Sequence, residues 1–328
     1  LSVMSFLEAT EALLRDGHQP ARSLYLSFGH DEEVGGVDGA LQVANHFAEQ
    51  SIEFDFVVDE GGAITQGMLS YVDRPAAIIG IGEKGYLNLK LTVNAPGGHS
   101  SQPPAQTGLG ILSRAIVKVE DNPFPAKLDF LHTTFDAVAP YAPFYYRLAM
   151  ANTWLLGPVI KAGLLKDKSA AATMRTTTAA TMASGSSKSN ILPTRAEAVI
   201  NFRIIPGETA ESVRDRVVEI IDDERVEVTI ETAINPAAIS PTDSTGYELL
   251  ASTIRGFDDN ILVAPYIVQG GTDARYFHQV SDNVYRFIMV RISPNSVQQI
   301  HGIDEQISVE DYLMAIRFYY AFIQRATG

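Results

Sequence analysis

The stretch Ser23–Gly36, SLYLSFGHDEEVGG, decides how the rest of the chain is interpreted. Leu24, Leu26 and Phe28 occupy alternate positions, which is the pattern of a β-strand. The strand runs directly into a histidine, three acidic residues and two glycines. A charge run of this kind is usually a solvated loop when it stands alone, so its meaning depends on the neighbouring elements of the chain.

A second apolar strand ends in acid in the same way. The spacing predicts a helix over 37–50 and a strand over Phe54–Val58, which leads straight into Asp59. A strand, a helix and a strand joined by short links form a right-handed parallel unit. Ligands of such sheets bind beyond the carboxyl ends of the strands. We therefore expect Glu32, Glu33 and Asp59 to meet at one edge of an α/β sheet.

The composition narrows the class of protein and of metal site. The chain has 328 residues, enough for two domains, and its 46% hydrophobic and 20% charged content is typical of globular proteins. The net charge of −14 argues against nucleic acid and anionic membranes as partners, and no apolar run is long enough to predict a membrane span. Cysteine is absent, so any metal must be held by His, Asp or Glu. The compartment stays open between cytoplasm and export.

The pattern changes near Gly85, where a second domain is expected. Its predicted elements are, in order, a strand over 87–93, a helix over 109–119, strands over 175–182 and 196–204, a helix after Thr209, and a strand over 225–233. This order is the split βαβ arrangement of an α+β, ferredoxin-like domain. We place this lid or dimerisation domain at 85–236, with an aromatic-rich helical insertion at 121–170. It interrupts an α/β domain, 1–84 and 237–328, with a mostly parallel sheet flanked by helices.

The two ends of the chain are predicted to be helical. The first residues, LSVMSFLEATEALLRDG, already show helical spacing but lack an initiator methionine, so we expect the chain to be part of a longer protein. The last helix is expected to begin at Ser308, with Asp311 three positions on, and to bury Leu313, Ile316 and Tyr320.

The acidic strand ends suggest metal chemistry. Glu33, Asp59 and His301 each follow an apolar strand or its loop, and carboxylate and imidazole are suitable ligands for zinc. Glu32 and Glu33 are neighbours, so both cannot face one metal equally, and one of them can face an attacking water instead. A metal that acidifies water beside a free carboxylate is the requirement of metal-assisted hydrolysis.

Seven motifs point to a family: GHDEEVGG, VVDEGG, GGHSSQP, GSSKSNILP, NFRIIPGET, GGTDAR and IHGIDEQIS. Each is weak alone. In this order, over essentially the whole chain, they resemble the M20 family of zinc peptidases and amidohydrolases, most of all its carboxypeptidase S and N-acyl-amino-acid hydrolase branch. The resemblance implies hydrolysis of an amide bond next to a free carboxylate, in dipeptide-like or N-acyl amino acid substrates, and two zinc ions in the intact protein.

The resemblance also implies a role for each matching residue. Glu32 corresponds to the general base and His99 to the histidine that stabilises the oxyanion, often across a dimer interface, so a homodimer through the lid is expected. The metal-binding positions are Glu33 and His301, which correspond to ligands of one metal, and Asp59, which corresponds to a ligand of the other. The substrate-binding positions are Asn190 for the carbonyl, Arg203 for the carboxylate and Gly271 for a backbone contact.

Simpler interpretations remain open for several of these residues. Asp59 could cap a turn while Glu60 binds the metal, and Arg203 could pair with Glu197 or Glu208. For Asp273 we prefer a helix-capping role.

The family's H-x-D motif and bridging aspartate are missing from this sequence. We therefore expect the chain alone to bind one zinc weakly, or none, and to be nearly inactive. A non-catalytic binding or assembly module is the alternative. A serine hydrolase is disfavoured, because the sequence has no G-x-S-x-G motif.

Overall fold

The computed structural model of the chain describes residues 1–66, 72–293, 296 and 299–328 and divides into two compact units. Unit 1 comprises Leu1–Glu83, Leu128–Ala162 and Ala238–Gly328, and unit 2 comprises Lys84–Lys127 and Gly163–Ala237. Each unit has a hydrophobic core of its own. Most of the predicted insertion is helical and groups with unit 1. No helix among the described residues is both long and apolar enough to cross a membrane.

A mixed sheet forms the centre of unit 1. Its strands are β1 (Val57–Asp59), β2 (Ile64–Thr65), β3 (Ala76–Glu83), β10 (Leu262–Val268), β11 (Val284–Arg286) and β12 (Arg291–Ile292). Strand β3 pairs in parallel with β10 and antiparallel with β2 and β11, while β1–β11 and β12–β2 are parallel pairs. The α/β class is thus confirmed, with more antiparallel pairing than expected.

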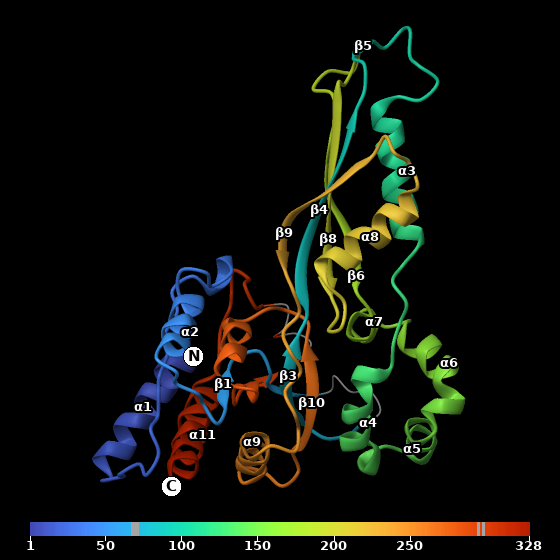
Figure 1. Ribbon diagram of the computed structural model, residues 1–328. Coiled ribbons are helices and arrows are strands. Elements are labelled where there is room, and N and C mark those ends of the chain that lie inside the picture. The colour runs from blue at the N-terminus through green and yellow to red at the C-terminus, as the bar shows by residue number, and fades with distance from the viewer. Residues whose placement is uncertain (67–71, 294–295, 297–298) are drawn as a thin grey trace. The chain divides into compact units, whose positions relative to one another are not determined.

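Helices surround this sheet. They are α1 (Ser2–Arg15), α2 (Ala40–Glu49), α4 (His132–Val138), α5 (Phe144–Ala151), α6 (Thr153–Leu164, which runs into unit 2), α9 (Thr245–Arg255) and α11 (Val309–Thr327), with 3₁₀ turns η1 (Glu32–Val34), η2 (Asp129–Leu131), η3 (Ala139–Tyr141) and η4 (Asp273–Gln279). Helices α1 and α11 lie side by side (Figure 1). Ser308 caps α11 as predicted, because its hydroxyl oxygen accepts a hydrogen bond from the Asp311 N–H at 3.0 Å.

The buried face of α11 agrees with the prediction in part, because Ile316 and Tyr320 are half-buried and pack against the core of unit 1. Phe318 and Phe322 stack with ring centroids 5.7 Å apart, and Phe318 meets Phe287 edge to face. Leu313 is instead 46% exposed. The helix carries apolar side chains on more than one stripe, and the aromatic core of unit 1 selects the stripe that contains Phe318.

The predicted strand over Leu24–Phe28 is wrong. The segment has no regular secondary structure, and Leu24, Tyr25 and Phe28 are 40–48% exposed. Among the described strands none pairs with it. The Tyr25 ring packs against Phe47 of α2, and the Phe28 ring lies 5.7 Å from Phe6 of α1. An alternating sequence becomes a strand only where a neighbouring strand satisfies its backbone groups.

Unit 2 contains the predicted split βαβ order. Its main sheet is antiparallel, in the order β6 (Thr177–Ser184), β8 (Arg195–Ile204), β4 (Gly85–Asn94), β9 (Glu227–Ile234). A small ladder joins β5 (Gly98–His99) to β7 (Ile191–Leu192). Helices α3 (Gly108–Asp121) and α8 (Ala210–Ile221) pack against the sheet, next to each other, and α7 (Lys168–Met174) precedes β6 (Figure 1).

Local sequence signals explain the elements of unit 2. Leu87, Leu89 and Leu91 alternate along β4 and are fully buried, as their spacing predicts. Helix α8 begins with a capping box: the Ser212 N–H donates to the Thr209 hydroxyl oxygen, and the Thr209 N–H donates to the Ser212 hydroxyl oxygen.

A buried lysine follows the unit boundary. Lys84 is 3% exposed, and its Nζ donates to the carbonyl oxygens of Ala172 (2.9 Å) and Arg175 (2.8 Å), at the C-terminal end of α7. Burial, together with the nearby Arg203 charge, lowers the pKa of Lys84 from 10.5 to about 7, while Glu208 opposes the shift. Keeping this ammonium charged below pH 7 therefore destabilises the native chain.

The stability of the chain is expected to rise with pH because of Lys84. Between pH 7 and 10.5 the native lysine loses its proton while the unfolded one keeps it, so the unfolded state binds more protons and this group adds on the order of a few kcal/mol as pH rises. Urea unfolding at pH 6.5 and 9.5 measures the gain. Lys84→Met should remove most of it, and an unchanged pH slope in that variant would contradict the assignment.

Candidate functional site

The acidic loop of the opening motif folds into the turn η1. The N–H groups of Val34 and Gly36 donate to the Asp31 carbonyl oxygen, at 3.1 and 2.9 Å. Gly36 has a φ of +69°, a conformation that favours glycine. The turn places the two neighbouring acids in different environments. The Glu33 side chain is 76% exposed, whereas Glu32 is half-buried.

Asp59 lies at the end of β1 and is half-buried. The Glu60 and Ala274 N–H groups and the Thr272 hydroxyl lie near its carboxylate. Its Oδ2 atom has no hydrogen-bond partner among the described residues. Burial raises the pKa of Asp59, and these donors together with the Arg286 charge oppose the rise. An orphaned buried carboxylate oxygen fits a cation ligand.

The carboxylates of the η1 turn repel those near the end of β1. Burial, followed by repulsion from Glu33, Glu60, Asp273 and Asp59, raises the pKa of Glu32 to about 7. Burial and the Asp59 charge raise the pKa of Asp273 to about 6. Glu32 therefore lies in an acidic environment, although the segment that precedes it is not the predicted strand. A bound cation would relieve this repulsion.

His301 lies next to one of the predicted ligands. Its Nδ1 is 3.7 Å from Glu33 Oε1, and both side chains are mostly exposed. His301 has a φ of +60°, unusual for a non-glycine residue, and its N–H donates to Glu305 Oε2. In the part of the chain that the structure describes, no three His, Asp or Glu side chains converge as a metal centre. Asp59 therefore does not join Glu33 and His301 in a three-ligand group. The carboxylate and imidazole donors of these residues are nonetheless of the types that bind zinc.

His99 and Asn190 lie together in unit 2. His99 is opposite Ile191 in the β5–β7 ladder, and the Ser100 N–H donates to the Asn190 carbonyl oxygen at 3.1 Å. The exposed His99 ring has its Nδ1 2.8 Å from Ser101 Oγ. These two predicted site residues are thus held near each other by backbone pairing.

Arg203 lies at the opposite end of β8 from β7. The strand from Arg195 to Arg203 spans about 26 Å. The Arg203 guanidinium stacks on the ring of Tyr86, 4.8 Å from its centroid. Neither alternative partner engages it: Glu197 pairs with Lys90 and Arg195, and Glu208 pairs with Lys127. Unit 2 of a single chain therefore does not bring Arg203 to His99 and Asn190.

The structure changes the interpretation of the GGTDAR motif. Thr272, and not Asp273, is the N-cap of η4, so the capping role predicted for Asp273 is wrong. The Asp273 carboxylate lies against Gly36, where a Cβ atom would be 2.2 Å from its Oδ1. Asp273 thus belongs to an acidic cluster with Glu32, Glu33, Asp59 and Glu60. Gly271 adjoins Arg275, because a Cβ there would be 1.9 Å from Arg275 Nη2.

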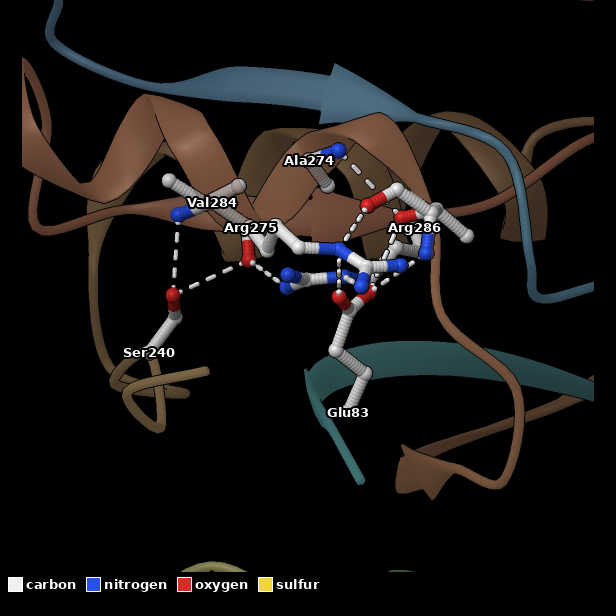
Figure 2. Close-up of polar contacts among 7 residues, drawn as sticks. Glu83, Ser240, Ala274, Arg275, Val284 and Arg286 are labelled. Atoms are coloured by element: carbon white, nitrogen blue, oxygen red, sulfur yellow. Dashed lines mark hydrogen bonds and ion pairs between the residues drawn. The ribbon is translucent and has the colours of Figure 1, made fainter. Parts of the chain in front are cut away.

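Sequence reasoning missed a buried ionic network that joins Glu83, Arg275 and Arg286 (Figure 2). Glu83, 1% exposed, accepts from Arg275 Nε at 3.0 Å and from Arg286 Nε at 3.1 Å. Arg286 is fully buried and also donates from Nη1 to the Val284 carbonyl oxygen. The available signal was a charged residue within each apolar strand, AAIIGIGE and VYRFIMV, since charges are rarely buried unless paired.

Comparisons with known proteins agree with the motifs. The family model for peptidase family M20/M25/M40 matches residues 1–325. A probable carboxypeptidase S-like 2 of Dictyostelium discoideum is 38% identical over 98% of this chain and 63% of its own length. The N-fatty-acyl-amino acid synthase/hydrolase PM20D1 of Xenopus tropicalis is 38% identical over 99% of this chain and 64% of its own length. The chain therefore spans less than two thirds of these two relatives.

Solved structures show the same fold at low sequence identity. An M20 family metallo-carboxypeptidase from Sulfolobus solfataricus aligns with a TM-score of 0.65 at 18% identity, covering 98% of this chain and 74% of that one. Human carnosine dipeptidase 1 aligns with a TM-score of 0.63 at 13% identity, covering 99% and 71%. From the family match over nearly its whole length, the chain belongs to peptidase family M20/M25/M40.

Proposed function

We propose that this chain takes part in the metal-dependent hydrolysis of an amide bond next to a free carboxylate. The substrates would be dipeptide-like molecules or N-acyl amino acids. The observation that carries the proposal is the group of mutually repelling carboxylates beside the Glu33–His301 pair. Family membership and relatives named as carboxypeptidase and N-fatty-acyl-amino acid hydrolase support it.

Each residue of the acidic cluster has a proposed task. Glu33 and His301 would hold one zinc ion and Asp59 would hold the other, and zinc supplies an acidified water and a polarised carbonyl when bound. Glu32 would take a proton from the attacking water and pass it to the leaving amine. A carboxyl group with a pKa near 7 is well suited to both transfers at neutral pH.

The residues of unit 2 would bind the substrate. Arg203 presents a planar fork that suits a carboxylate, His99 would stabilise the oxyanion, and Asn190 would contact the carbonyl. His99 and Asn190 lie near β7, at the far end of β8 from Arg203. We therefore propose that two copies of the chain pair, so that one copy's His99 and Asn190 serve the other's site. Gly271 would leave room for a backbone contact beside Arg275.

An amine-release assay tests this function. Because the sequence lacks the H-x-D motif and bridging aspartate, the protein with zinc is expected to hydrolyse an N-acyl amino acid only slowly, and a chelator should lower that slow rate at least about tenfold, since the ion supplies the nucleophile. Re-addition of zinc should restore it. The methyl ester of the same substrate serves as the control for the carboxylate and should react more slowly. Hydrolysis that is indifferent to chelation, or equal for acid and ester, would count against the proposal.

A further inference from the structure

The turn η1, which carries Glu32 and Glu33, is closed by backbone hydrogen bonds. The Gly35 N–H donates to the Glu32 carbonyl oxygen at 2.9 Å, and the Val34 N–H donates to the Asp31 carbonyl oxygen at 3.1 Å. None of the three residues of the turn is buried, so the turn has no core side chain to fix it. A short 3₁₀ turn at the surface is held weakly by its internal hydrogen bonds, and its conformation therefore depends on an external anchor.

A tyrosine of η4 supplies this anchor. The Tyr276 hydroxyl donates a hydrogen bond to the Gly35 carbonyl oxygen. Gly35 in turn donates its N–H to the Glu32 carbonyl oxygen, so a single residue joins the tyrosine to the first glutamate of the turn. Gly35 has a φ of +113°, a conformation that favours glycine. The end of the turn is thus fixed from outside by a side-chain hydrogen bond.

A second side chain of η4 fills the loop around the turn. A Cβ atom on Gly29 would lie 2.5 Å from Asp273 Oδ2, and one on Gly36 would overlap Asp273 Oδ1 and lie 3.0 Å from Tyr276 Cε2. Gly29 and Gly36 flank η1 in the sequence, so the loop closes around the Asp273 carboxylate without room for larger residues. Asp273 therefore supports both ends of the loop, while Tyr276 holds the turn itself.

The turn η4 is a firm support because it is fixed on two sides. Its Ala274 and Phe277 side chains are buried in a cluster with residues of α2. Between them, Arg275 Nε pairs with the buried Glu83 carboxylate at 3.0 Å (Figure 2). The position of the Tyr276 hydroxyl is therefore set by a packed core and a buried ion pair.

We propose that Tyr276 is a positioning residue for the turn η1. Its hydrogen bond to Gly35 fixes the backbone from which Glu33 reaches a cation and Glu32 reaches the attacking water. The inference rests on the proposed function, in which Glu33 binds zinc and Glu32 is the general base. It adds a residue that acts through the backbone of the turn and determines how both carboxylates face the site.

Zinc affinity, measured by competition with a chromophoric chelator, tests this role. Tyr276→Phe keeps the ring and removes the hydroxyl, and it should weaken zinc binding about tenfold. Tyr285→Phe is the matched control, because Tyr285 is also in unit 1 and donates its hydroxyl hydrogen to a backbone carbonyl oxygen, that of Pro241, at 2.7 Å. The control should lower the unfolding midpoint without changing zinc affinity.

Amide hydrogen exchange of the metal-free chain tests the anchor without zinc. In Tyr276→Phe the N–H groups of Val34 and Gly35 should exchange about 2- to 10-fold faster than in the parent, the effect of losing one hydrogen bond. In Tyr285→Phe their exchange should not change. Equal exchange in Tyr276→Phe and the parent would show that the tyrosine does not hold the turn, and the inference would be wrong.

Glu33→Gln separates failure of the inference from failure of the proposed function. If Glu33→Gln leaves zinc binding unchanged, Glu33 is no ligand and both ideas fall. If Glu33→Gln weakens binding but Tyr276→Phe binds zinc as the parent does, only the positioning role is wrong. Agreement requires that Tyr276→Phe have no further effect on zinc affinity in the Glu33→Gln background.

Discussion

Replacing Glu83 by glutamine is expected to lower the free energy of unfolding by about 3–5 kcal/mol. Glu83 is the shared anion of Arg275 and Arg286, and Arg286 is fully buried. The glutamine side chain would keep the size of the glutamate. Its neutral amide would, however, leave the guanidinium charges of Arg275 and Arg286 without their shared anionic partner. Arg286 Nη2 already has no hydrogen-bond partner among the described residues, so it has no spare interaction to compensate.

Urea unfolding of the metal-free chain measures this loss. Glu11→Gln is the control within unit 1, because Glu11 pairs with Arg15 on the exposed surface of α1 and its loss should cost less than about 1 kcal/mol. A Glu83→Gln variant as stable as the Glu11→Gln variant would show that the buried network contributes little. A second test is Arg286→Met, which removes the excess buried cation and should be tolerated better than Glu83→Gln.

The parts of the fold that could be predicted are those fixed by local pattern. The alternation of Leu87, Leu89 and Leu91 and the cap at Thr209 depend on neighbouring residues alone, and the structure contains both. The predicted strand at Leu24–Phe28 failed because a strand needs a partner that local sequence does not specify. On α11 the prediction held for Ile316 and Tyr320 but not for Leu313, because the core that the helix meets selects the stripe containing Phe318.

The candidate site was predictable where a motif carried it. Glu33 and His301 lie near opposite ends of the chain, and both the strand-end pattern and the resemblance to a family suggested that they approach one another. The ion pair between Glu83 and Arg286 was not predicted. It follows from the register of β11 against β3, which cannot be read from the sequence. The pKa of Glu32 likewise depends on burial and on carboxylates from other loops.

Glutamine at Glu32 is expected to reduce kcat for amide hydrolysis by about 10²- to 10⁴-fold, the usual contribution of a general base. The amide keeps the size of the side chain but cannot accept and return a proton. Glu32 is half-buried and accompanied by Glu33, Glu60, Asp273 and Asp59, so its neutralisation also relieves repulsion in the cluster. The variant should therefore bind zinc and substrate at least as well as the parent while it turns over slowly.

That combination distinguishes a base from a ligand. Glu33→Gln is the matched comparison, one position away and with the same chemical change, and it should lower zinc affinity because Glu33 is the carboxylate beside His301. Single-turnover kinetics in saturating zinc, with chelator competition for affinity, separates the two variants. Equal losses of zinc affinity in both would make Glu32 a ligand. Unchanged turnover in Glu32→Gln would remove the general base from this site, since a neutral amide cannot replace it.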